Sequence, residues 1–208
     1  MREEAIRVAG RLEGTLRIPD ETPRGIVVVA HPLPTHGGTM RNPLVAALAR
    51  AVASRGLYAL RFNFRGVGES AGEWTDGEEE WRDIGDAVDE AKRLGPGLPV
   101  GVAAYSFGAY QTLKWVANGG RVDGLALVGV PLRSVDLQRQ PLPAVPDGTF
   151  IVAAERDQFG TAAELRAALP RARIAEVKSV DHFFVGQRDE VGRLVADELS
   201  RALASTVR

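Results

Sequence analysis

The chain has 208 residues, and its 26 Lys and Arg against 27 Asp and Glu leave a formal net charge of −1. The sequence contains no cysteine, which excludes a disulfide framework, a thiolate metal site and a cysteine nucleophile. The cationic residues form no block, so nucleic acid is not expected as a partner. At roughly 150 residues per domain, the length predicts a single domain spanning residues 1–208.

The N-terminal segment carries acidic residues where a secretory signal would carry cations, because the sequence begins Met1-Arg2-Glu3-Glu4. No stretch of the sequence approaches the roughly 18 consecutive apolar residues that a membrane-spanning helix needs. We therefore expect a soluble, cytoplasmic protein without a membrane partner.

Short apolar runs, predicted to be strands, recur along the chain: residues 26–30, 57–62, 100–105, 125–130, 150–154 and 174–177. Most of these runs are continuously apolar rather than alternating, which is typical of strands covered on both faces in a largely parallel sheet. The opening segment, with Leu12, Leu16 and Ile18 around Gly14, predicts an antiparallel hairpin at the sheet edge.

Helical patterns separate these runs. Asn42 followed by Pro43 predicts a helix start, and an apolar stripe then continues toward Gly56. Apolar residues at helical spacing follow an acidic first turn at 78–80, and further helices are predicted over residues 107–117, 161–169 and 189–204. The alternation predicts an α/β fold with a mostly parallel, doubly wound sheet, in which the active site lies at the carboxyl ends of the strands.

The most specific motif is Ala104-Tyr105-Ser106-Phe107-Gly108, between a predicted strand and a predicted helix. It matches the nucleophile elbow G-x-S-x-G, with alanine in the first glycine position. The elbow holds its serine on a strained turn, so the residues two before and two after the serine must be small. Taken alone, the motif is equally consistent with a serine that caps the following helix.

A serine hydroxyl becomes a nucleophile when a base removes its proton and a carboxylate orients that base. His182, one of three histidines, lies after the last predicted strand and before the last helix. Asp157 is favoured over Asp181 as the carboxylate, because Asp157 directly follows a strand and Asp181 would need a cramped geometry beside its neighbour. The order Ser106, Asp157, His182 is that of the α/β-hydrolases.

An oxyanion hole needs two backbone N–H groups aimed at the developing negative charge. Phe107, the residue after the serine, supplies one of them. The other is expected from the loop His31-Pro32-Leu33-Pro34, where Leu33 is the only N–H donor in the middle of the turn because proline has none. No HExxH pattern or carboxylate cluster accompanies His31 and His36, so structural roles are expected for both, and no metal or other cofactor is predicted.

The chain resembles the α/β-hydrolase superfamily, and within it the small lidless bacterial serine hydrolases of the dienelactone-hydrolase-like group. The resemblance implies that Ser106 is the nucleophile, Asp157 the acid and His182 the base, with oxyanion donors at Leu33 and Phe107. Dienelactone hydrolases use a cysteine nucleophile, which this chain lacks, so their lactone substrate is not implied. Besides the elbow, the resemblance rests on four segments: residues 31–42, 61–70, 155–157 and 181–184.

We predict a serine hydrolase that cleaves small carboxylic esters through an acyl-enzyme. A thioesterase or a peptidase would use the same residues, and a non-catalytic binding module of this fold is the rival outside enzymes. The connection over residues 131–148 is too short for a helical cap, which predicts an open, shallow site. Several aromatic residues could line an acyl pocket or pack in the core, namely Phe64, Trp74, Phe159 and Phe184. The physiological substrate and the oligomeric state are left open.

Overall fold

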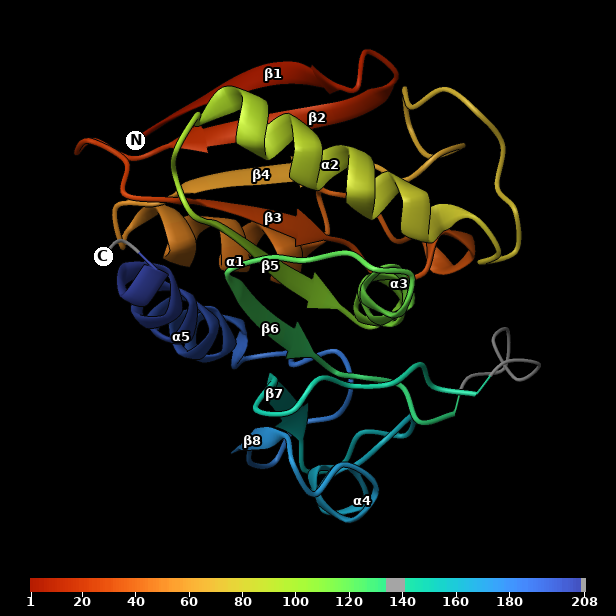
Figure 1. The fold of residues 1–208 in the computed structure, drawn as a ribbon. Coiled ribbons are helices and arrows are strands. Elements are labelled where there is room, and N and C mark those ends of the chain that lie inside the picture. The colour runs from red at the N-terminus through yellow and green to blue at the C-terminus, as the bar shows by residue number, and fades with distance from the viewer. Residues whose placement is uncertain (134–140, 207–208) are drawn as a thin grey trace.

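The computed structural model describes residues 1–133 and 141–206 (Figure 1). Its centre is a sheet with the strand order β1-β2-β4-β3-β5-β6-β7-β8. The strands from β4 to β8 in this order run parallel, whereas β1 and β2 are antiparallel and lie at one edge. The predicted α/β architecture is confirmed. The strands are β1 (Arg2–Val8), β2 (Leu12–Ile18), β3 (Ile26–Ala30), β4 (Tyr58–Phe62), β5 (Val100–Tyr105), β6 (Gly124–Val128), β7 (Phe150–Ala154) and β8 (Arg173–Val177).

Helices cover both faces of the sheet (Figure 1). They are α1 (Pro43–Ala53), α2 (Glu80–Leu94), α3 (Phe107–Ala117), α4 (Ala162–Ala168) and α5 (Arg188–Thr206). Helices α1 and α5 pack against one face, and α2, α3 and α4 pack against the other. In β3, Val27 and Val29 join the core beneath α1 and α5, while Val28 joins the opposite core. Apolar side chains are therefore needed at every position of this strand, which explains its continuous apolar run.

The predicted antiparallel hairpin at the sheet edge is confirmed, and it is formed by β1 and β2. The chain reverses at Ala9 and Gly10, which have φ angles of 48° and 71°, and Gly14 lies inside β2. A Cβ on Gly14 would come within 3.2 Å of the Ile6 and Val8 side chains. Gly14 is thus a strand position with close cross-strand neighbours, and the positive φ angles that a tight turn needs are found at residues 9 and 10.

Helix starts follow their predicted signals, although the first helix ends earlier than predicted. The Asn42 side chain accepts a hydrogen bond from the Leu44 N–H at 2.9 Å, and Pro43 opens α1, which ends at Ala53 rather than near Gly56. Helix α2 begins at Glu80, whose carboxylate is fully buried. This carboxylate accepts hydrogen bonds from the amide and hydroxyl of Thr75, so that it fixes the preceding loop onto the helix.

The predicted short connection between β6 and β7 lies partly outside the described residues, which omit 134–140. Its described parts, residues 131–133 and 141–148, contain no helix or strand. Within residues 1–133 and 141–206, no helix combines the length and apolar character that a bilayer crossing requires.

Candidate active site

Ser106 lies in the sharp turn between β5 and α3, with φ 55° and ψ −114°. A non-glycine residue at positive φ is strained, and this geometry exposes the serine side chain above the strand end. The Ser106 N–H donates to the Val128 carbonyl at 2.9 Å. A Cβ on Gly108 would lie 2.8 Å from the His31 carbonyl oxygen and 2.9 Å from the Ala30 Cβ. The predicted need for a small residue after the serine therefore arises because α3 starts directly against the end of β3.

His182 joins the serine to a carboxylate in one line of hydrogen bonds. Its Nε2 lies 2.8 Å from the Ser106 Oγ, and its Nδ1 lies 2.8 Å from the Asp157 Oδ2. Because an ionised carboxylate only accepts hydrogen bonds, Nδ1 carries the proton and Nε2 accepts from the serine hydroxyl. His182 is 4% exposed and Asp157 is 1% exposed. The imidazole thus lies between the serine hydroxyl and a buried carboxylate.

The two candidate carboxylates have different surroundings. Asp157 follows β7, and besides contacting the imidazole it accepts a hydrogen bond from the Phe159 N–H at 2.8 Å through Oδ1. Asp181 is exposed, and its Oδ1 accepts from the Phe183 N–H at 3.0 Å. Asp157 is therefore the carboxylate in hydrogen-bond contact with the His182 ring.

The sequence did not reveal the groups that hold the His182 ring in place. Gly129 has φ 55°, and a Cβ there would lie 3.1 Å from the ring Cε1 and 3.2 Å from Nδ1. The Phe159 ring stands nearly perpendicular to the imidazole, with 4.7 Å between ring centroids. The Tyr105 hydroxyl donates to the His182 backbone carbonyl at 2.9 Å, and burial raises the pKa of Tyr105, so that it stays a donor. Gly129, which directly follows the buried strand β6, was the one feature of the sequence that could have indicated this packing.

The two predicted oxyanion donors lie on loops that touch each other. Leu33 precedes a short 3-10 turn, η1 (Pro34–His36), and its carbonyl accepts from the His36 and Gly38 amides at 3.2 and 3.0 Å. Phe107 is the first residue of α3, where backbone N–H groups have no partner inside the helix. Within the described residues, neither the Leu33 nor the Phe107 N–H has a hydrogen-bond acceptor.

The four aromatic residues singled out from the sequence divide into two kinds. Phe64 and Phe184 are fully buried and pack in the two cores. Trp74 and Phe159 are half-buried. Phe159 contacts the His182 ring, and the Trp74 ring lies 5.3 Å from that of Phe107. Of these four residues, Trp74 and Phe159 are therefore the two whose side chains could contact a substrate.

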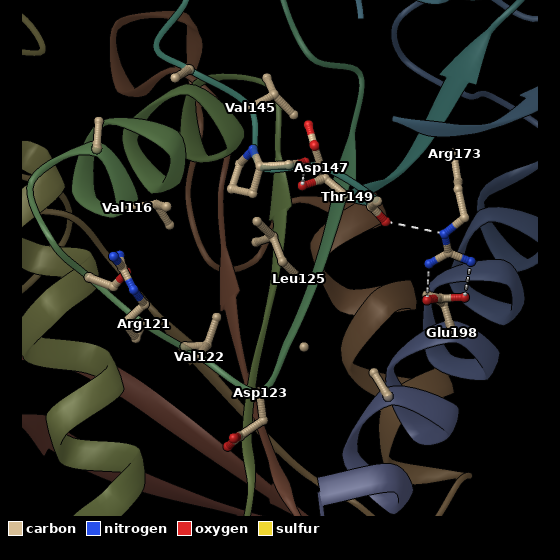
Figure 2. A pocket seen from close by; sticks show the side chains of 17 residues that line it. Val116, Arg121, Val122, Asp123, Leu125, Val145, Asp147, Thr149, Arg173 and Glu198 are labelled. Carbon is tan, nitrogen blue, oxygen red and sulfur yellow. Dashed lines mark hydrogen bonds and ion pairs between the residues drawn. The ribbon is translucent and has the colours of Figure 1, made fainter. Parts of the chain in front are cut away.

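A cavity of about 590 Å³ lies at the amino ends of the parallel strands, opposite the end where Ser106 lies (Figure 2). It adjoins Gly124, the first residue of β6, whereas Ser106 bonds to the last residue, Val128. A strand rise of ~3.3 Å per residue puts roughly 13 Å between these two ends. Figure 2 shows Arg173 facing Glu198 at the rim, and the Arg173 guanidinium also donates to the Gly148 carbonyl at 3.1 Å. Arg173 and Glu198 are thus bonded to each other, while Asp123 accepts from the Val100 amide at 2.8 Å and Asp147 pairs with Arg171 outside the cavity lining.

The sheet order, the strained strand-to-helix turn and the aligned serine, histidine and aspartate are features of α/β-hydrolases. The family described as serine aminopeptidase, S33, matches residues 21–202, and the chain belongs to this family. The chain is accordingly a member of the α/β-hydrolase superfamily with a serine-hydrolase-like fold.

Solved bacterial structures are similar over almost the whole chain. An alpha-beta serine hydrolase homologue from Coxiella burnetii is 28% identical, with a TM-score of 0.80, and the match covers 95% of this chain and 97% of that one. XC6422 from Xanthomonas campestris, described as a serine hydrolase without lid, is 25% identical with a TM-score of 0.82, covering 98% and 96%. The uncharacterized protein RP471 of Rickettsia prowazekii (strain Madrid E) is 25% identical, covering 91% of this chain and 84% of that protein. The two solved structures support an α/β serine hydrolase fold, and the second supports a fold without a lid.

Proposed function

We propose that the protein is a serine hydrolase that cleaves small carboxylic esters through an acyl-enzyme. Ser106 is the nucleophile, His182 the base and Asp157 the residue that orients the imidazole. The observation that carries the proposal is the unbroken line of two 2.8 Å contacts from the serine Oγ to the aspartate Oδ2. A serine that only capped a helix would have no need of a buried histidine at its hydroxyl.

The reaction follows from these contacts. The Ser106 Oγ attacks the ester carbonyl while His182 Nε2 takes the hydroxyl proton, and the carbonyl oxygen becomes an oxyanion held by the Leu33 and Phe107 amides. Collapse of this intermediate breaks the bond to the alcohol oxygen, which receives the proton from Nε2. Water then attacks the acyl-enzyme with His182 again as the base, which releases the acid and restores the serine. Asp157 stays ionised throughout and stabilises the imidazolium.

A peptidase is the second candidate, and the family name, serine aminopeptidase, favours it. Amide hydrolysis would use the same residues, but the leaving amine must be protonated before it departs. A comparison of substrates separates the two candidates: an ester, a thioester and an anilide with one common acyl group, and an amino-acid anilide with a free α-amine. Faster turnover of the amino-acid anilide than of the ester would replace the esterase proposal.

A fluorophosphonate probe tests the nucleophile. The wild type is expected to be labelled at Ser106, and Ser106→Ala to be unlabelled, with turnover reduced by about 10⁶-fold because the catalytic residues act as a unit. Ser54→Ala, at the exposed end of α1, is the matched control and should behave as the wild type. Labelling at Ser70 or Ser179 would overturn the assignment, and a wild type that is neither labelled nor active would favour the binding module.

A further inference from the structure

His31 is buried between two loops at the candidate site, and hydrogen bonds occupy both of its ring nitrogens. Its side chain is fully buried, Nδ1 lies 2.6 Å from the Pro32 carbonyl oxygen, and Nε2 lies 3.1 Å from the Phe64 backbone nitrogen. A carbonyl can only accept and an amide N–H can only donate, so Nδ1 carries the proton and Nε2 accepts. Burial lowers the pKa of His31 to about 4, so that the ring is neutral near pH 7.

The carbonyl that His31 contacts belongs to the same peptide unit as the Leu33 N–H. A peptide unit is planar, and in the trans form its C=O and N–H point in opposite directions. A bond that holds the Pro32 oxygen therefore also fixes the direction of the Leu33 N–H. Gly38 packs against this oxygen, since a Cβ there would lie 2.1 Å from it, and the amides of Gly38 and His36 hold the Leu33 carbonyl.

We propose that His31 is a positioning residue for the oxyanion hole, acting through the Pro32–Leu33 peptide. The imidazole links the Phe64 N–H to the Pro32 carbonyl, and this chain of hydrogen bonds ends at the Leu33 N–H. Hydrogen bonds in such a chain polarise one another, so the bond to the carbonyl also makes the amide a stronger donor. The inference rests on the proposed function, because it assigns the Leu33 amide to an oxyanion.

Two substitutions separate the two bonds of His31. In His31→Asn the amide nitrogen takes the place of Nδ1, which keeps the donor to Pro32 and removes the acceptor for Phe64. In His31→Gln the terminal oxygen takes the place of Nε2, which keeps the acceptor and removes the donor. Each variant leaves one buried backbone group without a partner, so a purely structural role predicts similar losses in both.

The expected result is an asymmetry in kcat. His31→Gln should lose up to about 10²-fold in kcat, the lower range for removal of an oxyanion donor, with KM nearly unchanged. It should also lose a similar factor in affinity for a boronic acid transition-state analogue. His31→Asn should keep most of the wild-type kcat. Rates are normalised to the folded fraction measured by circular dichroism.

The outcomes distinguish this inference from the proposed function. Equal losses of kcat in the two variants, or wild-type kcat in His31→Gln, would overturn the positioning role while the wild type remains active. A wild type without activity or probe labelling would overturn the proposed function instead. The Leu33 amide resonance then still tests the geometry, since its shift should be retained in His31→Asn and changed in His31→Gln. An unchanged shift in both variants contradicts the role of His31.

Discussion

The two ends of the parallel strands, here called the carboxyl edge and the amino edge, differ in the side chains that they bury. At the carboxyl edge, Ser106 has a strained backbone, and the side chains of His182 and Asp157 are almost completely buried and bonded to each other. The amino edge has a cavity of about 590 Å³, but the ion pair at its rim joins a half-exposed Arg173 to Glu198.

The cavity and the proposed reactive centre therefore lie at different ends of the same strands. A buried titratable pair and a residue in a sparsely populated conformation both cost folding free energy, so a site that keeps them indicates chemistry. The amino-edge cavity contains neither among the residues that are described there. If the carboxyl edge alone governs activity, substitutions there should change kcat and substitutions at the amino edge should not.

The largest expected effect separates the two carboxylates near His182. Asp157→Asn should lower kcat by about 10⁴-fold, because an amide in place of the carboxylate favours the wrong tautomer of the imidazole. Asp181→Asn, whose residue is exposed, is the matched control and should cost less than about threefold, since its carboxylate makes no contact with the ring. Steady-state kinetics on one aryl ester measures both, and the reverse ranking would show that the acid is misplaced.

Two glycines with positive φ allow a direct comparison of the edges. Gly129→Ala should reduce kcat by up to about 10²-fold, because its Cβ would push the His182 ring by a fraction of an ångström. Gly148→Ala, beside the amino-edge cavity, has φ +77° and nothing within 4 Å of a Cβ. Both variants carry the same kind of backbone strain, roughly 1–2 kcal/mol, so Tm should fall in both and kcat only in Gly129→Ala. A matching loss of kcat in Gly148→Ala would refute the difference between the edges.

The pH dependence of stability should also differ between the edges. Burial lowers the pKa of His31 from 6.5 to about 4 in the folded state. Between these values the unfolded chain binds more protons, so this stability is complete above pH 6.5 and is lost as pH falls toward 4, by at most about 1.4 kcal/mol per unit. His31→Asn should remove this slope in urea titrations. At the amino edge, ion pairing with Arg173 lowers the pKa of Glu198, so its contribution is lost only below pH 4.5.

Substrate size tests how open the carboxyl edge is. Because residues 131–133 and 141–148 contain no helix that could bury a long acyl chain, methylenes beyond the first few should gain little of the ~0.8 kcal/mol that full burial of each would give. Turnover of p-nitrophenyl esters should therefore peak at acyl chains of about two to six carbons and vary several-fold across the series. A maximum at longer chains, or a jump in activity at an oil–water interface, would reveal a cover over the site.

The smallest effect is expected at the amino-edge ion pair. Arg173→Gln removes one partner of Glu198, but the arginine side chain is 53% exposed, so the free energy of unfolding should fall by less than about 1 kcal/mol. The values of kcat and KM should not change, because the pair lies at the far end of the strands from Ser106. A change in kcat would mean that the amino edge influences the chemistry.

Sequence patterns predicted the local features of the molecule well. The Asn42–Pro43 helix start and the strand-to-helix turn at Ser106 each depend on a few consecutive residues, and the structure has both. Asp157 was preferred over Asp181 from its place after a strand, and it is the one that contacts the imidazole. The edge hairpin was predicted correctly, but its turn at Ala9 and Gly10 was not located, because those two residues carry no turn signal stronger than that of Gly14.

Contacts between distant segments could not be predicted from the sequence patterns. The packing of Gly129 beneath the His182 ring and the bond from Tyr105 to the His182 carbonyl join residues 53 and 77 positions apart, as 182 − 129 and 182 − 105. Periodicity reports which face of an element is apolar, but it does not report which loop meets which. The burial of the Glu80 carboxylate was not predicted either, since an acidic first turn is usually solvated.

The outer strands of the sheet have a consequence for the behaviour of the molecule in concentrated solution. An open sheet exposes the backbone hydrogen-bonding groups of its outermost strands, and another molecule can add a strand there and start aggregation. The outermost strand β1 presents the exposed charged side chains of Arg2, Glu3, Glu4 and Arg7. The outermost strand on the other side, β8, carries Arg173 and Glu176, both in ion pairs. A strand that docked on either edge would have to displace or cover these charges, which opposes edge-to-edge association.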